Sequence, residues 1–269
     1  MAAVEHVARR SDAPAWAVVL QQELRDLWVG GRGLPLGLAF SILLSAMAYL
    51  AATSEEFNFL EQRESVSLVV QVAIAVGALL ALLATADAIS GERERGTLES
   101  LLLTPVSRRA LVSGKLIAAL SLWLAAFAIT VPYVWFLGRG LDIVGDALVT
   151  GLVVGTLLAV FLGSLGLVVS VFADSNRVSL SVSLFVLLAL FAPTQLPGSV
   201  QQGWAGDLLL RLNPVTAGEQ FVGKILVSGH AWSEDISWLV SPIAAAVLFA
   251  AAAPLVGARF VRLFGGIRG

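Results

Sequence analysis

The amino-acid sequence predicts an all-α polytopic membrane protein that crosses the bilayer six times. Of its 269 residues, 58% are hydrophobic and only 13% are charged, whereas soluble domains carry about 25% charged residues. The mean hydropathy is +0.87. Six stretches contain no charged residue, and each reaches the roughly 20 residues that a transmembrane helix needs. We therefore expect a single transmembrane domain over residues 1–269.

An amphipathic helix is predicted before the first span, over residues 14–28. Trp16, Leu20, Leu24 and Trp28 recur there at helical spacing among polar residues. Such a helix lies in the membrane interface with its tryptophans at headgroup level, or it packs on the body as a short soluble helix. We favour the interfacial position because a glycine-rich hinge at 30–33 leads directly into the first span.

The predicted spans follow from residue 33 to residue 258. They are residues 33–54, 65–86, 116–137, 147–172, 178–206 and 236–258. The fifth stretch is too long for one straight span, and Pro193 and Pro197 interrupt it. Since proline ends or kinks a helix, we expect a helix over 179–191, followed by irregular or re-entrant backbone.

Small residues within the spans predict close helix packing rather than chemistry. The fourth span carries Gly151, Gly155, Gly163 and Gly166, and the fifth carries Ser179, Ser181 and Ser183 at a spacing that does not share one helical face.

The distribution of Lys and Arg predicts the orientation. Thirteen of the 17 lie in the N-terminus, the loop at 87–115, the turn at 173–177 and the C-terminus, and the others are Arg63, Arg139, Arg211 and Lys224. Because basic residues accumulate on the cytoplasmic side, both termini and the 87–115 loop are expected in the cytoplasm, and the protein in the cytoplasmic (inner) membrane.

The loop at 193–235 is expected on the exterior as a re-entrant helical hairpin. It is longer than an ordinary connection, it carries a helical pattern over 217–227, and it is rich in apolar residues. Irregular backbone at membrane depth is tolerated only where protein or a water-filled cavity covers it.

The segment 87–109 concentrates charge between two apolar spans. Gly91 is expected to turn the chain as it leaves the second span, Glu92–Arg95 to stay outside the hydrocarbon, and Gly96 to break the run. Thr97 then caps a short amphipathic helix over 98–103. Taken alone, the segment is either a docking surface for a soluble partner or an ordinary positive-inside loop.

The residues of this segment carry a resemblance to a known family. Residues 92–109 read ERERGTLESLLLTPVSRR, and Gly114-Lys115 follows. This resembles the hallmark of type-2 ABC-transporter permeases, roughly E-x-E-x-G-T-L-E-x-L-L-x-T-P, then a basic pair and G-K. The run from Leu209 to Pro214 resembles the subgroup that contains the permease of nitrous-oxide-reductase maturation.

The resemblance implies a mechanism. Two permease subunits pair, as a homodimer or a heterodimer, and each receives a separate ATP-binding-cassette ATPase that drives export across the membrane. Residues 91–104 would form the coupling helix and the hairpin at 193–235 the outer gate. The docking residues would be Glu92, Arg93, Glu94, Arg95, Gly96, Thr97, Leu98, Glu99 and Leu102, and the gate residues Trp204, Asn213, Pro214 and Phe221.

The chain itself is expected to be non-catalytic, with no catalytic, metal or cofactor residues. It has no cysteine and two histidines, His6 and His230, neither with a second ligand at metal-site spacing. Gly114-Lys115 lacks the rest of a phosphate loop, so ATP and Mg²⁺ are expected in the partner ATPase. A net charge of −2 gives no reason to expect nucleic acid as a partner.

Two other functions remain open from the residues. A secondary transporter would show intramembrane charges and an inverted repeat, and neither is visible. A mechanotransmission or scaffold subunit would dock the ATPase but act on a periplasmic or surface protein. The sequence does not identify the substrate.

Overall fold

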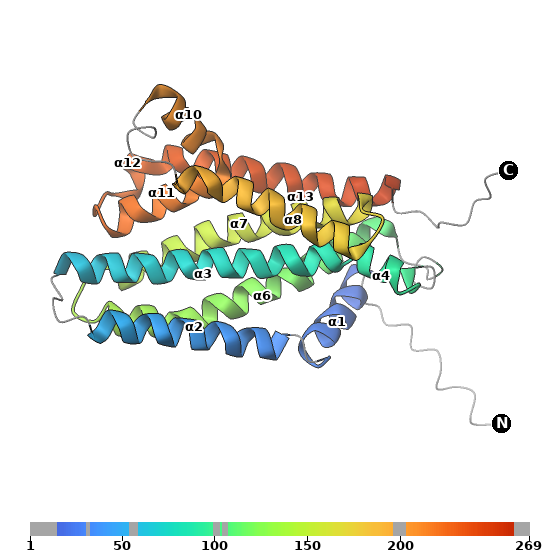
Figure 1. Cartoon of the computed structure of the whole chain (residues 1–269), viewed down its shortest axis with the longest axis horizontal. Coiled ribbons are helices and arrows are strands. Elements are labelled where there is room, and N and C mark those ends of the chain that lie inside the picture. The colour runs from blue at the N-terminus through green and yellow to red at the C-terminus, as the bar shows by residue number, and fades with distance from the viewer. Residues whose placement is uncertain are drawn as a thin grey trace.

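The protein is a bundle of long helices that run along one axis (Figure 1). The computed structural model describes residues 15–30, 33–53, 59–98, 103, 107–195 and 203–260. Within these residues six helices are long and apolar enough to cross a membrane. The prediction of an all-α protein with six spans is confirmed.

The long helices match the predicted spans in order. They are α2 (Gly33–Thr53), α3 (Phe59–Asp87), α6 (Arg108–Leu137), α7 (Val144–Phe172), α8 (Asn176–Phe191) and α13 (Val240–Phe260). The helices α3 and α6 extend several residues beyond the charge-free stretches. The length of an uninterrupted apolar run matches the thickness of the hydrocarbon core of the bilayer. The helix itself can be longer, because its backbone hydrogen bonds continue through the polar headgroup layer.

Short elements lie at the two ends of the bundle (Figure 1). At one end, called the α4 end below, are α1 (Ala15–Trp28) and α4 (Ser90–Glu94). The far end of α13 lies there too, since the rings of Phe172 and Phe260 are 5.1 Å apart. The first and last described helices therefore meet the same end of the bundle, as six spans require.

The opposite end, called the α11 end, carries the segment predicted as a hairpin. Its elements are η1 (Ala192–Gln195), α10 (Trp204–Leu212), α11 (Pro214–Leu226), α12 (Trp232–Asp235) and η2 (Ile236–Leu239). Residues 196–202, including Pro197, lie outside the described part. The helix expected over 217–227 begins earlier, because Asn213 caps it and Pro214 occupies its first position.

The helix α1 packs against the body along α6. The Trp28 indole Nε1 donates to Ser121 Oγ at 3.0 Å, and Val19 is buried. Packing on α6 agrees with the second alternative for this segment, while its placement in the membrane interface stays a prediction.

Glycines allow α7 to occupy the centre of the bundle. A Cβ on Gly155 would lie 2.0 Å from Trp123 Cη2 of α6, and one on Gly166 would lie 2.4 Å from Thr85 Oγ1 of α3. The indole of Trp123 also donates to Thr156 Oγ1 at 3.1 Å. The predicted role of these glycines in close helix packing is confirmed.

The helix α8 is peripheral, and its serines divide by face. Ser179 and Ser183 are buried against the bundle, whereas Ser181 is exposed. Ser179 Oγ donates to the carbonyl of Ala86 at 2.7 Å, so this hydroxyl supports packing as predicted.

We predict that Gly155→Ala lowers stability, because the new methyl group overlaps the Trp123 ring. Overpacking of this kind costs about 1–3 kcal/mol, and the thermal midpoint in detergent measures it. The matched control is Gly145→Ala on the same helix, where a Cβ would meet no atom within 4 Å. Equal midpoints for the two variants would show that α6 and α7 are not in close contact.

Candidate functional site

The helix α4 begins at a break in the polypeptide that α7 holds in place. The helix α3 ends at Asp87 and α4 starts at Ser90. Ser170 Oγ of α7 accepts hydrogen bonds from Ile89 N at 3.1 Å and from Ser90 N at 2.9 Å. The first N–H groups of a helix lack partners within it, so this hydroxyl satisfies donors that the break leaves open.

The prediction that Gly91 turns the chain is wrong. Gly91 is buried inside α4, and the turn falls on Ala88 and Ile89. Glycine is needed for another reason, since a Cβ at this position would lie 2.1 Å from Asp87 Oδ1. Gly96 does break the run, with φ of +72°, a conformation that glycine adopts without steric cost.

Glu92 joins α4 to α6 and α1 through a buried lysine. Lys115 Nζ lies 2.5 Å from Glu92 Oε1 and 2.5 Å from Glu23 Oε1. Lys115 is only 4% exposed. A lone ammonium group at such a position would lose its hydration without compensation, so two carboxylates from separate helices replace the water.

Arg93 closes the end of α7. Its guanidinium donates to the carbonyls of Ala173 and Val171, the latter at 3.1 Å. These carbonyls belong to the last turn of a 29-residue helix and its C-cap. The C-terminal end of a helix carries partial negative charge and unsatisfied acceptors, so the arginine supplies both hydrogen bonds and opposite charge.

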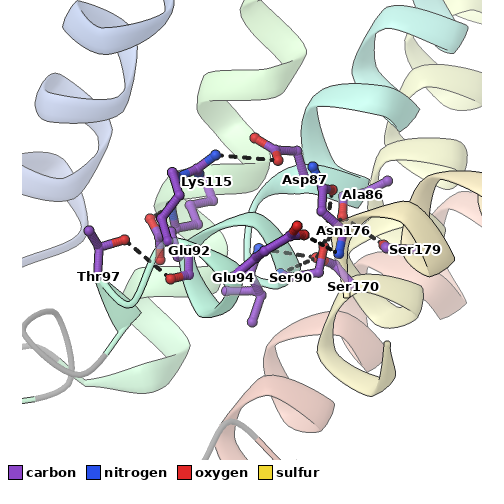
Figure 2. Close-up of polar contacts among 12 residues, drawn as sticks. Ala86, Asp87, Ser90, Glu92, Glu94, Thr97, Lys115, Ser170, Asn176 and Ser179 are labelled. Carbon is purple, nitrogen blue, oxygen red and sulfur yellow. Dashed lines mark hydrogen bonds and ion pairs between the residues drawn. The ribbon is translucent and has the colours of Figure 1, made fainter. Parts of the chain in front are cut away.

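Glu94 and Arg95 reach two further helices. Glu94 Oε2 accepts from the backbone N of Asn176 at 3.0 Å, which places a negative charge at the positive N-terminal end of α8. Arg95 Nη1 lies 3.6 Å from Asp87 Oδ1 at the end of α3. Figure 2 shows Glu92, Glu94, Asp87 and Asn176 gathered around α4.

The four charges of residues 92–95 therefore reach four different long helices: α6, α7, α8 and α3. Leu98 adds an apolar attachment, because it is 5% exposed in a cluster with Ile89, Val112 and Leu167. We name this set of contacts, made by residues 89–98, the α4 junction.

The predicted docking residues divide into two groups at the junction. Glu92, Arg93 and Leu98 face the body of the protein, whereas Glu94, Arg95, Gly96 and Thr97 are exposed. Thr97 Oγ1 donates to the carbonyl of Glu92 at 3.3 Å. Glu99, Leu102 and most of the amphipathic helix expected over 98–103 lie outside the described residues. Docking at any of these positions stays a prediction.

Three of the four predicted gate residues anchor the α11 end. Asn213 Oδ1 accepts from Val215 N at 3.0 Å, and its Nδ2 donates to the carbonyl of Leu190 in α8 at 2.7 Å. Pro214 and Phe221 are buried, whereas Trp204 is 84% exposed. Their role in gating is untested by these contacts.

A polar cluster holds α11 to α12. Asp235 accepts from Lys224 Nζ at 2.8 Å and lies 2.6 Å from His230 Nδ1. In the part of the chain that the structure describes, no three His, Asp or Glu side chains form a group that could hold a metal ion.

Comparison with known proteins identifies the family. The profile of the ABC-2 family transporter proteins matches residues 17–264. The chain belongs to this family. It is also 34% identical over 99 residues to the probable ABC transporter permease protein NosY of Stutzerimonas stutzeri. That match covers 36% of the chain and 34% of the relative, so the chain spans about a third of the length of the relative that it matches.

Membership of the ABC-2 family makes the chain a transmembrane subunit of an ABC transporter. The sequence reading missed the pairing of Lys115 with Glu23 and Glu92. The only sequence feature that marks this ion triad is the position of Lys115 just before an apolar run. Nothing in that run indicates which acidic residues face the lysine.

We predict that Lys115→Met destabilises the protein, because Glu23 and Glu92 would then face each other without a cation. Removing one partner of a buried ion pair costs about 3–5 kcal/mol of stability. We expect a loss near the low end of this range, because Glu23 keeps 28% of its side-chain surface exposed to solvent. Tryptophan fluorescence during thermal unfolding measures the change.

The control is Arg109→Met, which removes an exposed cation from the same helix. The triple variant with Glu23→Gln and Glu92→Gln is expected to recover part of the loss. An unchanged midpoint for Lys115→Met would exclude the ion triad as a stabilising contact.

We also predict a pH-dependent effect at Glu219 in α11. Burial raises the pKa of this carboxyl from 4.5 to about 7. The folded protein therefore holds this proton more tightly than the unfolded chain, and the resulting stabilisation is present below pH 4.5 and lost as the pH rises to about 7. Glu219→Gln should raise the thermal midpoint more at pH 8 than at pH 5.

The matched control is Glu234→Gln, which neutralises an exposed carboxylate on the neighbouring α12. Equal shifts at both pH values for Glu219→Gln would contradict a buried, protonated carboxyl.

Proposed function

We propose that this chain is the membrane subunit of an ATP-driven exporter, and that its α4 junction transmits movement from a separate ATPase subunit. The observation that supports this proposal is the attachment of one short helix to four long ones. Glu92, Arg93, Glu94 and Arg95 contact α6, α7, α8 and α3, respectively. A force applied to α4 would act on all four helices at once.

The exposed side of the junction is suited to receiving that force. Glu94, Arg95, Gly96 and Thr97 form its exposed edge, and the predicted coupling segment 91–104 continues after them in the sequence. Their inward neighbours Glu92 and Arg93 are fixed to the bundle. Glu92 and Arg93 are thus assigned to transmission alone, whereas Glu94 and Arg95 combine exposure for docking with contacts to α8 and α3.

The helix α8 offers a path from the α4 end to the α11 end. Glu94 contacts its first residue, Asn176, and the carbonyl of Leu190 near its last turn accepts from Asn213 of the hairpin segment. A helix of 16 residues is about 24 Å long. Displacement of α4 would in this way move the predicted gate at 193–235.

The remaining parts of the proposed function follow from the family. ATP and Mg²⁺ would bind in the ATPase, because the chain has no phosphate loop. A second permease subunit would pair with this one in the inner membrane, with the α4 end and both termini in the cytoplasm, as the distribution of basic residues predicts. The relative named as a permease supports the same assignment.

We predict that Thr97→Cys, labelled with a cysteine-reactive benzophenone, cross-links to an ATPase on illumination of native membranes. The chain has no cysteine of its own, so the label marks one position. Mass spectrometry of the cross-linked product should identify a protein with a phosphate-loop motif. Trp204→Cys at the opposite end, which is also exposed, should give no such product.

The same two variants test the orientation. A membrane-impermeant maleimide should label the Thr97→Cys variant in inside-out vesicles and the Trp204→Cys variant in right-side-out ones. Equal cross-linking from both positions, or none from Thr97→Cys while the complex is intact, would overturn the docking assignment. ATP hydrolysis that responds only when a third, periplasmic protein is added would indicate a mechanotransmission role instead of export.

A further inference from the structure

A cleft of about 820 Å³ opens beside the α4 junction. The helices α1, α3, α6 and α8 supply most of its walls, with Leu36 of α2 at one side. Its volume falls within the range of about 300–1,000 Å³ that is typical of sites for small molecules. Glu92 and Arg95 of the junction are among the residues that line it.

The walls of the cleft change from polar to apolar in the same direction on three helices. Polar groups lie at the α4 end: Asp87 on α3, Lys115 on α6 and Asn176 on α8. Seven or eight residues deeper, the same helices contribute Leu80, Leu122 and Leu184. That separation is about two helical turns, or roughly 10–12 Å. The cleft therefore offers a polar mouth above an apolar floor and fits an amphipathic molecule.

The charges at the mouth favour a cation. Four carboxylates line the cleft, those of Glu23, Asp26, Asp87 and Glu92, against two basic groups, Lys115 and Arg95. Lys115 is shared by Glu23 and Glu92, and the buried Glu92 Oε2 receives no hydrogen bond from the described residues. A formal excess of two negative charges, bounded by apolar walls, attracts cations and repels anions.

We propose that this cleft binds lipophilic cations: molecules with one positive head group, such as a phosphonium or quaternary ammonium, on an apolar body. The head group lies near Asp26 and Glu92, and the body contacts Leu80, Leu122 and Leu184. An anionic lipid would meet the carboxylates, and a small inorganic ion would leave the apolar floor unfilled. As the substrate class of an exporter, this inference rests on the proposed function, whereas binding itself does not.

Tetraphenylphosphonium and tetraphenylborate provide the test, because they have similar size and shape and opposite charge. Equilibrium dialysis is carried out on the purified chain in lipid nanodiscs, and empty nanodiscs give the partition into lipid. We expect saturable binding of the phosphonium above that background and none of the borate.

Two variants and one matched control locate the site. Asp26→Asn should weaken phosphonium binding about two- to fivefold, the effect of losing one exposed ion pair. Asp174→Asn, the same change at an exposed residue that does not line the cleft, should leave binding unchanged. Ala84→Phe, which fills the cleft without changing its charge, should abolish binding, with thermal unfolding as the check on folding.

Several results would overturn the proposal. The first is phosphonium binding no greater than in empty nanodiscs, and the second is equal binding by Asp26→Asn and the unsubstituted chain. The third is saturable binding of the borate. The fourth is dissociation of a homodimer by Ala84→Phe, which would show that a second copy covers the cleft. Binding that persists when Thr97→Cys fails to cross-link an ATPase would overturn the exporter function and leave the site. Cross-linking of an ATPase by Thr97→Cys without phosphonium binding would leave the exporter function and overturn the binding site.

Discussion

The buried ammonium group of Lys115 is the constraint on which the α4 end of this protein depends. It brings together carboxylates from α1 and α4, which lie far apart in the sequence, at 2.5 Å each. The lysine belongs to α6, close to its start, so three elements that share no backbone hydrogen bond with one another meet at one charge. Without the carboxylates the lysine could not be buried, and without the lysine the carboxylates would repel each other.

The rest of the junction uses the ends of helices. Arg93 donates to the last carbonyls of α7, Glu94 accepts from the first N–H of α8, and Ser170 accepts from the first N–H groups of α4. Helix ends are where backbone groups lack partners and where the partial charges of the helix are concentrated. A segment of alternating acidic and basic residues can therefore satisfy helix ends of both signs, as Arg93 and Glu94 do in this chain.

Packing divides the bundle into a fixed centre and a more exposed periphery. The helix α7 is closely packed through its glycines against Trp123 and Thr85. Of the residues in the most apolar stretch of α7, 61% are buried, against 17% for the corresponding stretch of α8. Regions with few buried contacts open and shift at lower cost in free energy than closely packed ones. The proposed displacement of α8 agrees with this distribution, since α8 has the smaller buried share of the two helices.

The sequence by itself determined the six spans, the end of the fifth helix near Pro193, the close packing at the glycines of α7 and the family. These depend on local properties: apolar length, proline geometry and side-chain size. It placed the turn at Gly91 incorrectly, because the reason for that glycine is the approach of the Asp87 carboxylate. Only the tertiary structure decided which charges of residues 92–95 face inward. That choice depends on Lys115, which pairs with Glu92, and on Ala173, whose carbonyl accepts from Arg93. Helix packing brings both to α4, and no pattern within the segment encodes them.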